Sequence, residues 1–212
     1  MHKIDAISIP FYSFTSSNSL LEKVLQDLKD KNFVPELEPG NGSVLENYFY
    51  DELFDFFDES IKQVKKLYYK DEIEFPITTC WVNKFNVLQK LRLHNHSNSV
   101  ICGIYYLTSH ENNSPTVFNA PNPWTYNYSE NVMNMTISKE NTNMISGTIF
   151  PEAGTLVLFP ASLFHYMKAM NQKNNRMTIA FNTFPSGIIS NYKTNELFVR
   201  PKSLREQFGQ PR

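Results

Sequence analysis

Apolar residues recur with helical spacing in two segments in the first third of the chain. Residues 16–32 carry Leu20, Leu21, Val24 and Leu28 on one face, with Ser and Asn at the start as capping residues. Residues 51–71 carry a longer stripe, made of Leu53, Phe56, Phe57, Ile61, Val64, Leu67 and Tyr68. Lysines cluster late in this second segment, where a helix dipole favours positive charge. The spacing therefore predicts two helices, each with one apolar face to bury.

From residue 76 onward the pattern changes to short β-rich runs separated by Asn, Ser, Pro and Gly. These runs follow one another at 77–88, 99–108, 115–120, 147–150, 154–160, 164–170 and 176–184. An earlier strand is predicted at 6–14, and the Pro- and Gly-bearing stretch 34–50 is typical of a loop. Many short strands with turn signals between them indicate a β-sandwich or barrel. The predicted fold class is α+β, mainly β, with the two helices supporting the strands.

The chain is predicted to form a single domain over 1–212. Residues 1–75 are its helical buttress, 76–184 its β-core and 185–212 a C-terminal tail. Within the core, the polar stretch 121–147 is too long for an ordinary connection and suggests a lid over a site. A surface insertion without that role fits the same stretch equally well.

Charge and cysteine content narrow the class of protein. The chain has 20 Lys and Arg against 21 Asp and Glu, whereas general binders of nucleic acid or membrane surfaces show a basic excess. Neither partner is therefore expected. Cys80 and Cys102 both lie in apolar runs, which predicts buried thiols and a cytoplasmic location, in the host cytoplasm if the protein is viral. No apolar run approaches about 18 residues, so no membrane span is predicted.

Two histidines one residue apart, His94 and His96, open the run HNHSNSVICGIYYL at 94–107. Side chains at i and i+2 of an extended strand face the same side, so both histidines can reach one metal ion. A solvated pair at a strand entrance is the alternative. The pair alone does not decide between the two interpretations.

His165 is the candidate for a third metal ligand. It follows the apolar strand GTLVLFP and the turn PAS, a place from which a side chain can face a cavity. Arg176 then opens another apolar strand, where a lone cation needs an anion. A satisfied core histidine and a surface arginine are the alternatives. The remaining histidines, His2 and His110, fall at the terminus and in a predicted loop.

The order of these pieces resembles that of the 2-oxoglutarate and Fe(II)-dependent oxygenases, and more narrowly a family of 2OG-Fe(II) oxygenases from bacteria and marine phages. The pieces are W-V-N at 81–83, H-N-H at 94–96, C-G-I-Y-Y at 102–106, A-P at 120–121, G-T-L-V-L-F-P at 154–160, His165, and R-M-T-I-A-F-N at 176–182. The resemblance covers 76–184 closely. It implies a double-stranded β-helix, the jelly-roll or cupin-like fold of that superfamily.

The second histidine departs from the wider superfamily, which has Asp or Glu at the position of His96. Two histidines and one carboxylate form the usual Fe(II) face, so the resemblance implies a three-histidine face of His94, His96 and His165 here. Neutral imidazoles leave the ion more positive, and the dianionic cosubstrate offsets part of that charge. Cys102 and Ser97 stand where the narrower family tends to have Ser and Pro, and we expect these small residues to tune the site.

The resemblance also implies a cosubstrate pocket and a reaction. Arg176 offers a planar fork for the distal carboxylate of 2-oxoglutarate, Tyr106 a second contact, and Asn83 a contact to the 1-carboxylate. Tyr106 faces away from Tyr105 by strand alternation. A core aromatic and a strand-end cap are the alternatives for Tyr106 and Asn83. The implied activity is an Fe(II)-, 2-oxoglutarate- and O2-dependent dioxygenase that hydroxylates a substrate and releases succinate and CO2.

Two other classes fit parts of the pattern. A three-histidine cupin-type metalloenzyme that does not use 2-oxoglutarate also needs H-x-H and a distal histidine. It further needs a Glu soon after the pair, which the stretch 97–103 lacks, and it leaves Arg176 without a task. In a non-enzymatic β-sandwich binding protein the histidines are incidental. The sequence does not distinguish a small-molecule substrate from a peptidyl one.

Overall fold

The computed structural model describes residues 9–30, 43–44, 50–85, 89–109, 113–120, 145–167, 175–189 and 197–208. Both predicted helices are present, as α1 (Asn18–Asp30) and α2 (Asp51–Tyr68). Ser17 caps α1, because its hydroxyl accepts a hydrogen bond from the backbone N–H of Leu20 at 3.2 Å. A short helix, α4 (Leu204–Phe208), lies near the C-terminus. Its Arg205 forms ion pairs with Asp55 and Asp58 of α2.

The strands that precede the core and those that form its first half are β1 (Tyr12–Thr15), β2 (Ser43–Val44), β3 (Ile77–Phe85), β4 (Leu91–His94), β5 (Ile101–Tyr106) and β6 (Thr116–Ala120). The second half holds β7 (Ile145–Ile149), β8 (Thr155–Pro160), β9 (Phe164–Met167) and β10 (Arg176–Thr183), and β11 (Gly187–Ile189) and β12 (Leu197–Val199) follow. Each predicted β-rich run from residue 76 onward thus contains a strand.

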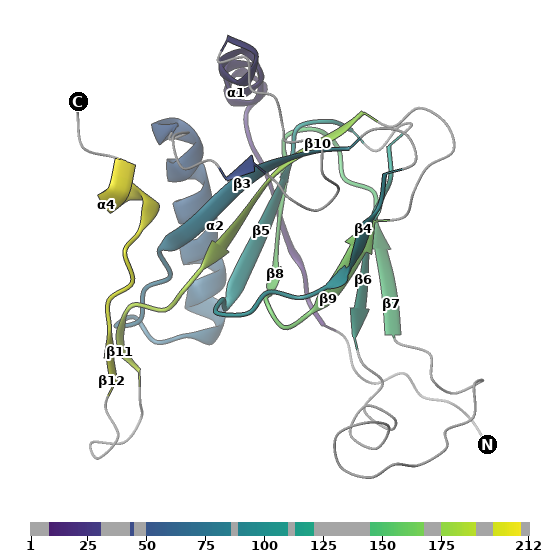
Figure 1. The fold of residues 1–212 in the computed structure, drawn as a ribbon. Coiled ribbons are helices and arrows are strands. Elements are labelled where there is room, and N and C mark those ends of the chain that lie inside the picture. Colours follow the sequence, from purple (N-terminus) through teal and green to yellow (C-terminus); the bar gives the residue numbers. More distant parts are fainter. Residues whose placement is uncertain are drawn as a thin grey trace, which may run out of the picture.

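Two sheets face each other in the core. The larger has the order β1-β8-β5-β10-β3-β2, and the smaller has the order β4-β9-β6-β7, with β4 at one edge. Consecutive strands from β3 to β10 pass from one sheet to the other, except that β6 and β7 are neighbours in the smaller sheet. All pairings between these strands are antiparallel. This winding is the double-stranded β-helix, so the predicted fold class is confirmed (Figure 1).

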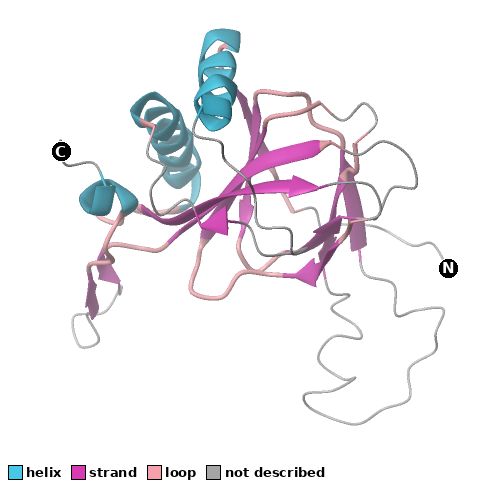
Figure 2. Cartoon of the chain, turned by 45° about the horizontal axis from the view of Figure 1, so that its top comes forward, coloured by secondary structure: helices cyan, strands magenta, loops and turns pink. Residues whose placement is uncertain are grey.

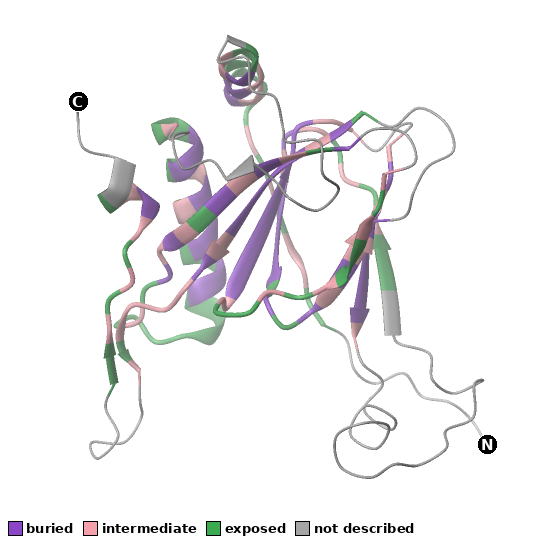
Figure 3. Ribbon diagram, viewed as in Figure 1, coloured by how far each residue is buried: buried purple, intermediate pink, exposed green. Residues whose placement is uncertain are grey.

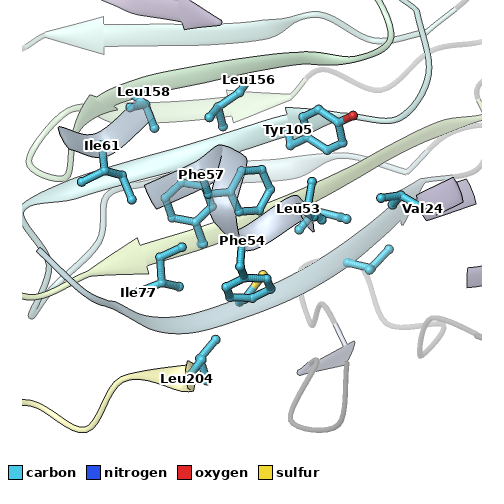
Figure 4. Packing of buried hydrophobic residues seen from close by; sticks show 14 of the residues in the cluster. Val24, Leu53, Phe54, Phe57, Ile61, Ile77, Tyr105, Leu156, Leu158 and Leu204 are labelled. Carbon is cyan, nitrogen blue, oxygen red and sulfur yellow. The ribbon is translucent and has the colours of Figure 1, made fainter. Parts of the chain in front are cut away.

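The helices cover the outer face of the larger sheet. Figure 2 shows α1 and α2 on one side of the strands, and the smaller sheet lies on the other side. Leu53, Phe57 and Ile61 of α2 pack onto Tyr105 and its neighbours in the sheet (Figure 4). Burying one such side chain contributes about 1.5–3 kcal/mol to folding. A second apolar cluster lies between the two sheets and includes Cys102, Ile104, Tyr106 and Phe159 of the larger sheet and Phe118 of the smaller one.

Strand β5 therefore has a buried residue at every position, which Figure 3 shows as an unbroken purple strand. Alternation places Tyr105 in the cluster under the helices and Tyr106 in the cluster between the sheets, as the sequence predicted. Gly103 lies directly against the ring of Phe181, which a Cβ at that position would overlap. The ring of Phe181 packs in turn on Phe57, with the ring centroids 4.7 Å apart.

Some predicted boundaries were wrong. The first strand begins at Tyr12 rather than at residue 6, and β2 interrupts the predicted loop at 34–50 by pairing with β3. In α2, Phe54 is buried although it lay outside the predicted stripe, whereas Leu67 and Tyr68 are exposed. The inward position in the last turn is taken by Lys65, which bonds to the carbonyl of Asp71 and to a Glu74 carboxylate oxygen at 2.6 Å.

Two other segments that the sequence singled out are only partly covered by the described residues. Residues 121–144 of the suggested lid lie outside the described residues, and 145–147 belong to β7. The C-terminal stretch 185–212 contains β11, β12 and α4. In the part of the chain that the structure describes, no helix has the length and apolar character needed to cross a membrane.

Candidate functional site

His94 is turned into the space between the sheets by an irregularity in strand β4. Leu91 pairs with Met167 and His94 pairs with His165, so three steps along β4 match two steps along β9. The extra residue forms a β-bulge, at which Arg92 and Leu93 are both exposed. In a regular strand, Leu91 and His94 would face opposite sides. The bulge thus lets both residues face inward.

His96 follows the end of β4 and is held by its backbone and by a ring contact. Its N–H donates to the carbonyl of Ala161 at 3.0 Å. Its imidazole packs beside the indole of Trp81 on β3, with the ring centroids 5.8 Å apart. Asn98 then turns the chain in the left-handed region, with φ 54°, which asparagine tolerates better than most residues. The predicted i, i+2 pair is therefore formed by a strand end and the loop after it.

His165 is the most buried of the three histidines, with 3% of its surface exposed. It is the second residue of β9 and follows the turn at 161–162, as the sequence predicted. The rings of Phe118 and Phe159 flank its imidazole at centroid distances of 5.7 and 5.0 Å. These aromatic side chains fix the ring and limit the access of water.

The three imidazoles converge. One ring nitrogen from each of His94, His96 and His165 lies within 4.8 Å of the other two, and no Asp, Glu or Cys of the described residues joins this group. The Nε2 atoms of His96 and His165 are 3.3 Å apart. Two imidazole ligands at about 2.1 Å from a shared ion, at roughly tetrahedral or octahedral angles, have nitrogens separated by about this distance.

Backbone carbonyls determine which nitrogen of two of these rings can bind an ion. The Nδ1 of His94 lies 2.8 Å from the carbonyl oxygen of Arg92, and the Nδ1 of His165 lies 3.2 Å from that of Leu163. A carbonyl oxygen only accepts, so each Nδ1 carries the proton and donates. The Nε2 atoms therefore carry lone pairs, which is the arrangement that orients metal-binding histidines.

Burial also keeps two of the imidazoles neutral. Burial, with a smaller contribution from the neighbouring His94, lowers the pKa of His165 to about 3 and the pKa of His96 to about 4. A neutral imidazole is the form that binds a metal. At neutral pH these two imidazoles are therefore in the form that binds a cation.

Arg176 opens β10 and is buried, with 5% of its surface exposed. Its Nη1 donates to the carbonyl of Ser114 at 2.6 Å, and its Nη2 donates to the hydroxyl of Thr116 at 2.7 Å. The guanidinium also lies 5.2 Å from the ring centre of Tyr106. The sequence assigned Arg176 and Tyr106 to the same carboxylate; the two side chains lie together in the structure, and their contact to a carboxylate stays a prediction.

Thr116, which the sequence analysis did not single out, connects these two residues. Its hydroxyl lies 2.6 Å from the phenol oxygen of Tyr106 and also accepts from Arg176. Burial raises the pKa of Tyr106, so its phenol keeps its proton. The hydroxyls of Tyr106 and Thr116 then carry two protons, and the hydrogen bond between their oxygens uses only one of them. One O–H of the pair remains available to a ligand acceptor beside the guanidinium.

Arg176 and its partner Thr116 lie next to the histidines along the strands. On β6, Thr116 pairs with Met167 and Phe118 pairs with His165, so Thr116 is one inward-facing position from the histidine row. This step corresponds to about 6.6 Å along a strand. The structure thus brings His94, His96, His165, Arg176 and Tyr106 into one continuous region between the sheets.

Asn83 and Cys102 border this region. Asn83 pairs with Thr178 in the register of β3 and β10, and its Nδ2 donates weakly to the Thr178 hydroxyl at 3.5 Å. Thr178 in turn pairs with Tyr106, which places Asn83 near the Arg176 end of the region. The contact of Asn83 to a 1-carboxylate stays a prediction. Cys102 donates to the side-chain oxygen of Asn182 at 3.1 Å.

Comparison with protein families identifies the core. Residues 79–182 match the family model described as "Putative 2OG-Fe(II) oxygenase". The core of this chain is similar to the 2OG-Fe(II) oxygenases. The resemblance stated from the sequence is confirmed, and so are the cofactors Fe(II) and 2-oxoglutarate. No curated protein sequence matches the chain.

Solved structures share the oxygenase fold at low sequence identity. HygX from Streptomyces hygroscopicus, solved with nickel and 2-oxoglutarate bound, has a TM-score of 0.59 and 11% identity, over 83% of this chain and 82% of its own. A prolyl-4-hydroxylase from Pseudomonas putida has a TM-score of 0.52 and 12% identity, over 82% and 93% of the two chains. SnoN, an α-ketoglutarate-dependent epimerase from nogalamycin biosynthesis, has a TM-score of 0.57 and 11% identity, over 92% and 90%.

The residues present suit the ion that an oxygenase of this family needs. Imidazole nitrogens bind Fe(II), and three on one face leave positions open for other ligands. The family match also favours the oxygenase over the cupin-type and non-enzymatic alternatives that the sequence left open.

Proposed function

We propose that this chain is an Fe(II)- and 2-oxoglutarate-dependent dioxygenase that hydroxylates its substrate and releases succinate and CO2. One observation carries the proposal. Three histidine nitrogens converge within 4.8 Å of one another, and Thr116, one inward-facing position away, contacts both the buried Arg176 and Tyr106. A cation site and an anion site are thus built side by side between two sheets.

In this proposal His94, His96 and His165 hold the ion through Nε2. The carbonyls of Arg92 and Leu163 keep two of the rings in the required tautomer. A ferrous ion in that position supplies the electron transfers that let O2 oxidise both 2-oxoglutarate and the substrate. Trp81, Phe118 and Phe159 pack on the imidazoles and keep water away from them.

Arg176 pairs with the distal carboxylate of 2-oxoglutarate in this proposal. Its planar fork forms two parallel hydrogen bonds to a carboxylate more readily than a lysine does. The free O–H of the Tyr106–Thr116 pair adds a further donor. Because Arg176 is buried, water screens its charge weakly, and a carboxylate ligand is therefore favoured there over a neutral one.

The proposal also specifies the type of reaction, which is hydroxylation rather than another oxidation. Proteins with this fold include a prolyl-4-hydroxylase and an epimerase, so the fold itself is compatible with more than one outcome. Hydroxylation requires only that substrate, O2 and 2-oxoglutarate share the site. The chain's lack of a basic excess supports a substrate other than nucleic acid.

The test is anaerobic titration of the purified chain with Fe(II) and 2-oxoglutarate, followed by exposure to air. We expect a weak visible charge-transfer band before air and succinate afterwards. His165→Ala should lose both signals, and Arg176→Ala should need more 2-oxoglutarate while it still binds iron. Arg92→Ala is the matched control, because it removes an exposed side chain and keeps the carbonyl that holds His94. No band and no succinate from the unaltered chain would refute the proposal.

A further inference from the structure

Strands β11 and β12 form a separate two-stranded sheet, the β11–β12 arm, which projects from the body of the molecule (Figure 1). Its two strands, GII and LFV, contain only apolar residues and one glycine. Ile188, Leu197 and Phe198 are exposed over 48%, 59% and 71% of their surfaces. Ile188 pairs with Phe198 on one face of the arm, and Leu197 lies on the other face. Both faces of the arm therefore present apolar side chains to solvent.

A sheet of this kind needs a partner. Two strands alone are marginally stable in water, and a third strand or a packed neighbour is required for independent stability. Among the described strands, none adds to the outer edge of β11 or of β12. Ser186 exchanges two backbone hydrogen bonds with Glu74, at 2.7 and 2.9 Å, and these bonds attach the base of the arm to the body. The arm is thus held at its base, while its apolar residues stay uncovered.

The open edge of β12 is centred on Phe198. Because the backbone groups of Ser186 are bonded outside the arm, the ladder between the two strands begins at the pair of Gly187 and Val199. Hydrogen-bonded and non-bonded pairs alternate along an antiparallel ladder, so the next bonded pair is the one that contains Leu197. The N–H and the carbonyl of Phe198 therefore point away from β11, toward the open edge.

We propose that the β11–β12 arm is a dimerisation element, and that it binds the same arm of a second copy of this chain. The two β12 strands pair edge to edge and antiparallel, about a two-fold axis at Phe198. Each Phe198 then donates one hydrogen bond to the partner's Phe198 and accepts one from it, and a four-stranded sheet of order β11-β12-β12-β11 results. Two-fold dimers that use the same surface on both subunits are the commonest assemblies of soluble proteins.

The sequence around β12 is complementary to itself in this register. Glu196 and Arg200 stand two residues before and two residues after Phe198. Antiparallel pairing about Phe198 sets position 196 of one copy against position 200 of the other, so opposite charges meet at each end of the shared ladder. Within its own chain Arg200 has a long contact of 3.5 Å to Glu206, and 75% of its side chain is exposed. Its guanidinium is therefore accessible to a partner.

Apolar contact supports the same arrangement. The two Phe198 rings become a cross-strand aromatic pair, with one Ile188 beside each of them on the same face. A formal net charge of −1 leaves little repulsion between two copies. Four short strands bury less than the roughly 1,200–2,000 Å² of a standard interface, so we expect a reversible dimer with a dissociation constant in the micromolar range. The arm lies at the end of the molecule opposite the smaller sheet, so the histidines stay accessible (Figures 1 and 2).

Sedimentation of the full chain at concentrations from about 1 to 200 μM measures the assembly. The unaltered chain should change from monomer to dimer over this range. F198E places two like charges at the centre of the pairing and should weaken the dimer at least about 20-fold. L67E is the matched control, because Leu67 is 60% exposed on α2 and lies outside the arm, and it should dimerise like the unaltered chain. Ni(II), which binds imidazoles and avoids oxidation, should bind all three proteins equally, which checks the fold.

Charge reversal tests the register. E196R and R200E should each weaken the dimer at least about fivefold, because each reversal places like charges together at both ends of the ladder. The double variant E196R/R200E restores opposite charges and should return to within about twofold of the unaltered chain. Losses that simply add in the double variant would overturn the strand pairing, as would a chain that stays monomeric at 200 μM or an F198E dimer as strong as the unaltered one. If F198E does not fold, the charge variants decide, since they leave every apolar residue of the arm in place.

Discussion

At the scale of single residues, Thr116 shows how a small side chain can determine the properties of larger ones. It is buried, and its one oxygen contacts both the Arg176 guanidinium and the Tyr106 phenol. Without that oxygen, a buried cation and a buried hydroxyl each lose a partner. Leaving such a group unsatisfied costs about 1–3 kcal/mol.

Replacing Thr116 by valine should therefore weaken 2-oxoglutarate binding about 5- to 150-fold, whereas T116S should stay within about threefold of the unaltered chain. The range follows from about 1–3 kcal/mol for the lost hydrogen bonds. Titration with 2-oxoglutarate at fixed Ni(II) measures the effect, and titration with Ni(II) alone serves as the control. If T116V lost Ni(II) affinity as well, Thr116 would be a general structural residue rather than part of the anion pocket.

The chemistry of each residue type explains why some residues of the candidate site can be found from the sequence and others cannot. Histidine and arginine are rare in apolar strands, so His165 and Arg176 stand out once they are placed beside a histidine pair. Thr116 lies in an ordinary strand run, PTVFNA at 115–120, and threonine is common in strands. Only its register opposite Met167, one step from His165, reveals its role. Pairing between strands so distant in sequence is not visible in local patterns.

Cys102 is a residue whose environment makes it inert. Burial raises the pKa of its thiol to about 12, and its Sγ donates to Asn182. Since the thiolate is the reactive form, alkylation of the folded chain should be very slow at pH 8. The rate should rise about tenfold per pH unit as long as the fold persists. Mass spectrometry after iodoacetamide treatment checks this, with the urea-unfolded chain as the reference, and rapid alkylation of the folded chain at pH 8 would contradict it.

At the scale of elements, the register between paired strands determines which way a side chain faces, and simple alternation along one strand can give the wrong orientation. In LRLH at 91–94, simple alternation places Leu91 and Leu93 on one face and His94 on the other. The bulge reverses the second half of this pattern, so Leu93 is 46% exposed and His94 faces inward. Helices and strand runs are predictable because their periodicity is local. A bulge depends on the partner strand, so the four residues of β4 were not predicted as a strand at all.

A second element-level contact permits a sharp stability prediction. Because Phe181 lies directly against Gly103, G103A should force the ring to move and lower the free energy of unfolding by about 1–3 kcal/mol. The smaller side chain in F181L should relieve the overlap. In a double-mutant cycle measured by urea unfolding, G103A should therefore cost less in the F181L background than in the unaltered chain. An equal cost in both backgrounds would mean that the Phe181 ring is not what restricts the size of the residue at position 103.

At the scale of the whole molecule, the buried histidines make the metal-free chain sensitive to acid. The folded-state pKa values of about 4 for His96 and about 3 for His165 lie below the value of about 6.5 in an unfolded chain. Below pH 6.5 the unfolded chain takes up protons that the folded chain does not. The free energy of unfolding should therefore fall as the pH drops from about 6.5 toward 4 and 3.

The slope should be at most about 1.4 kcal/mol per pH unit from His165, with less from the half-buried His96. Urea unfolding of metal-free protein at pH 7.5, 6.0 and 5.0 measures the slope. Carboxylates also titrate toward the acid end, so H165Q provides the comparison. Its unfolding free energy should depend less steeply on pH between 6.5 and 5, and an identical slope would show that His165 is not the group responsible.

The position of β4 has a consequence for how the protein behaves in solution. Among the described strands this one is an edge of the smaller sheet, and it presents an exposed leucine, Leu93, on that edge strand. Such edges readily pair with other chains and start aggregation. An ion bound by both His94 on β4 and His165 on β9 would link the edge strand to its neighbour. We therefore expect chelator-treated protein to form aggregates on storage sooner than metal-loaded protein, so that the ion also protects the chain from self-association.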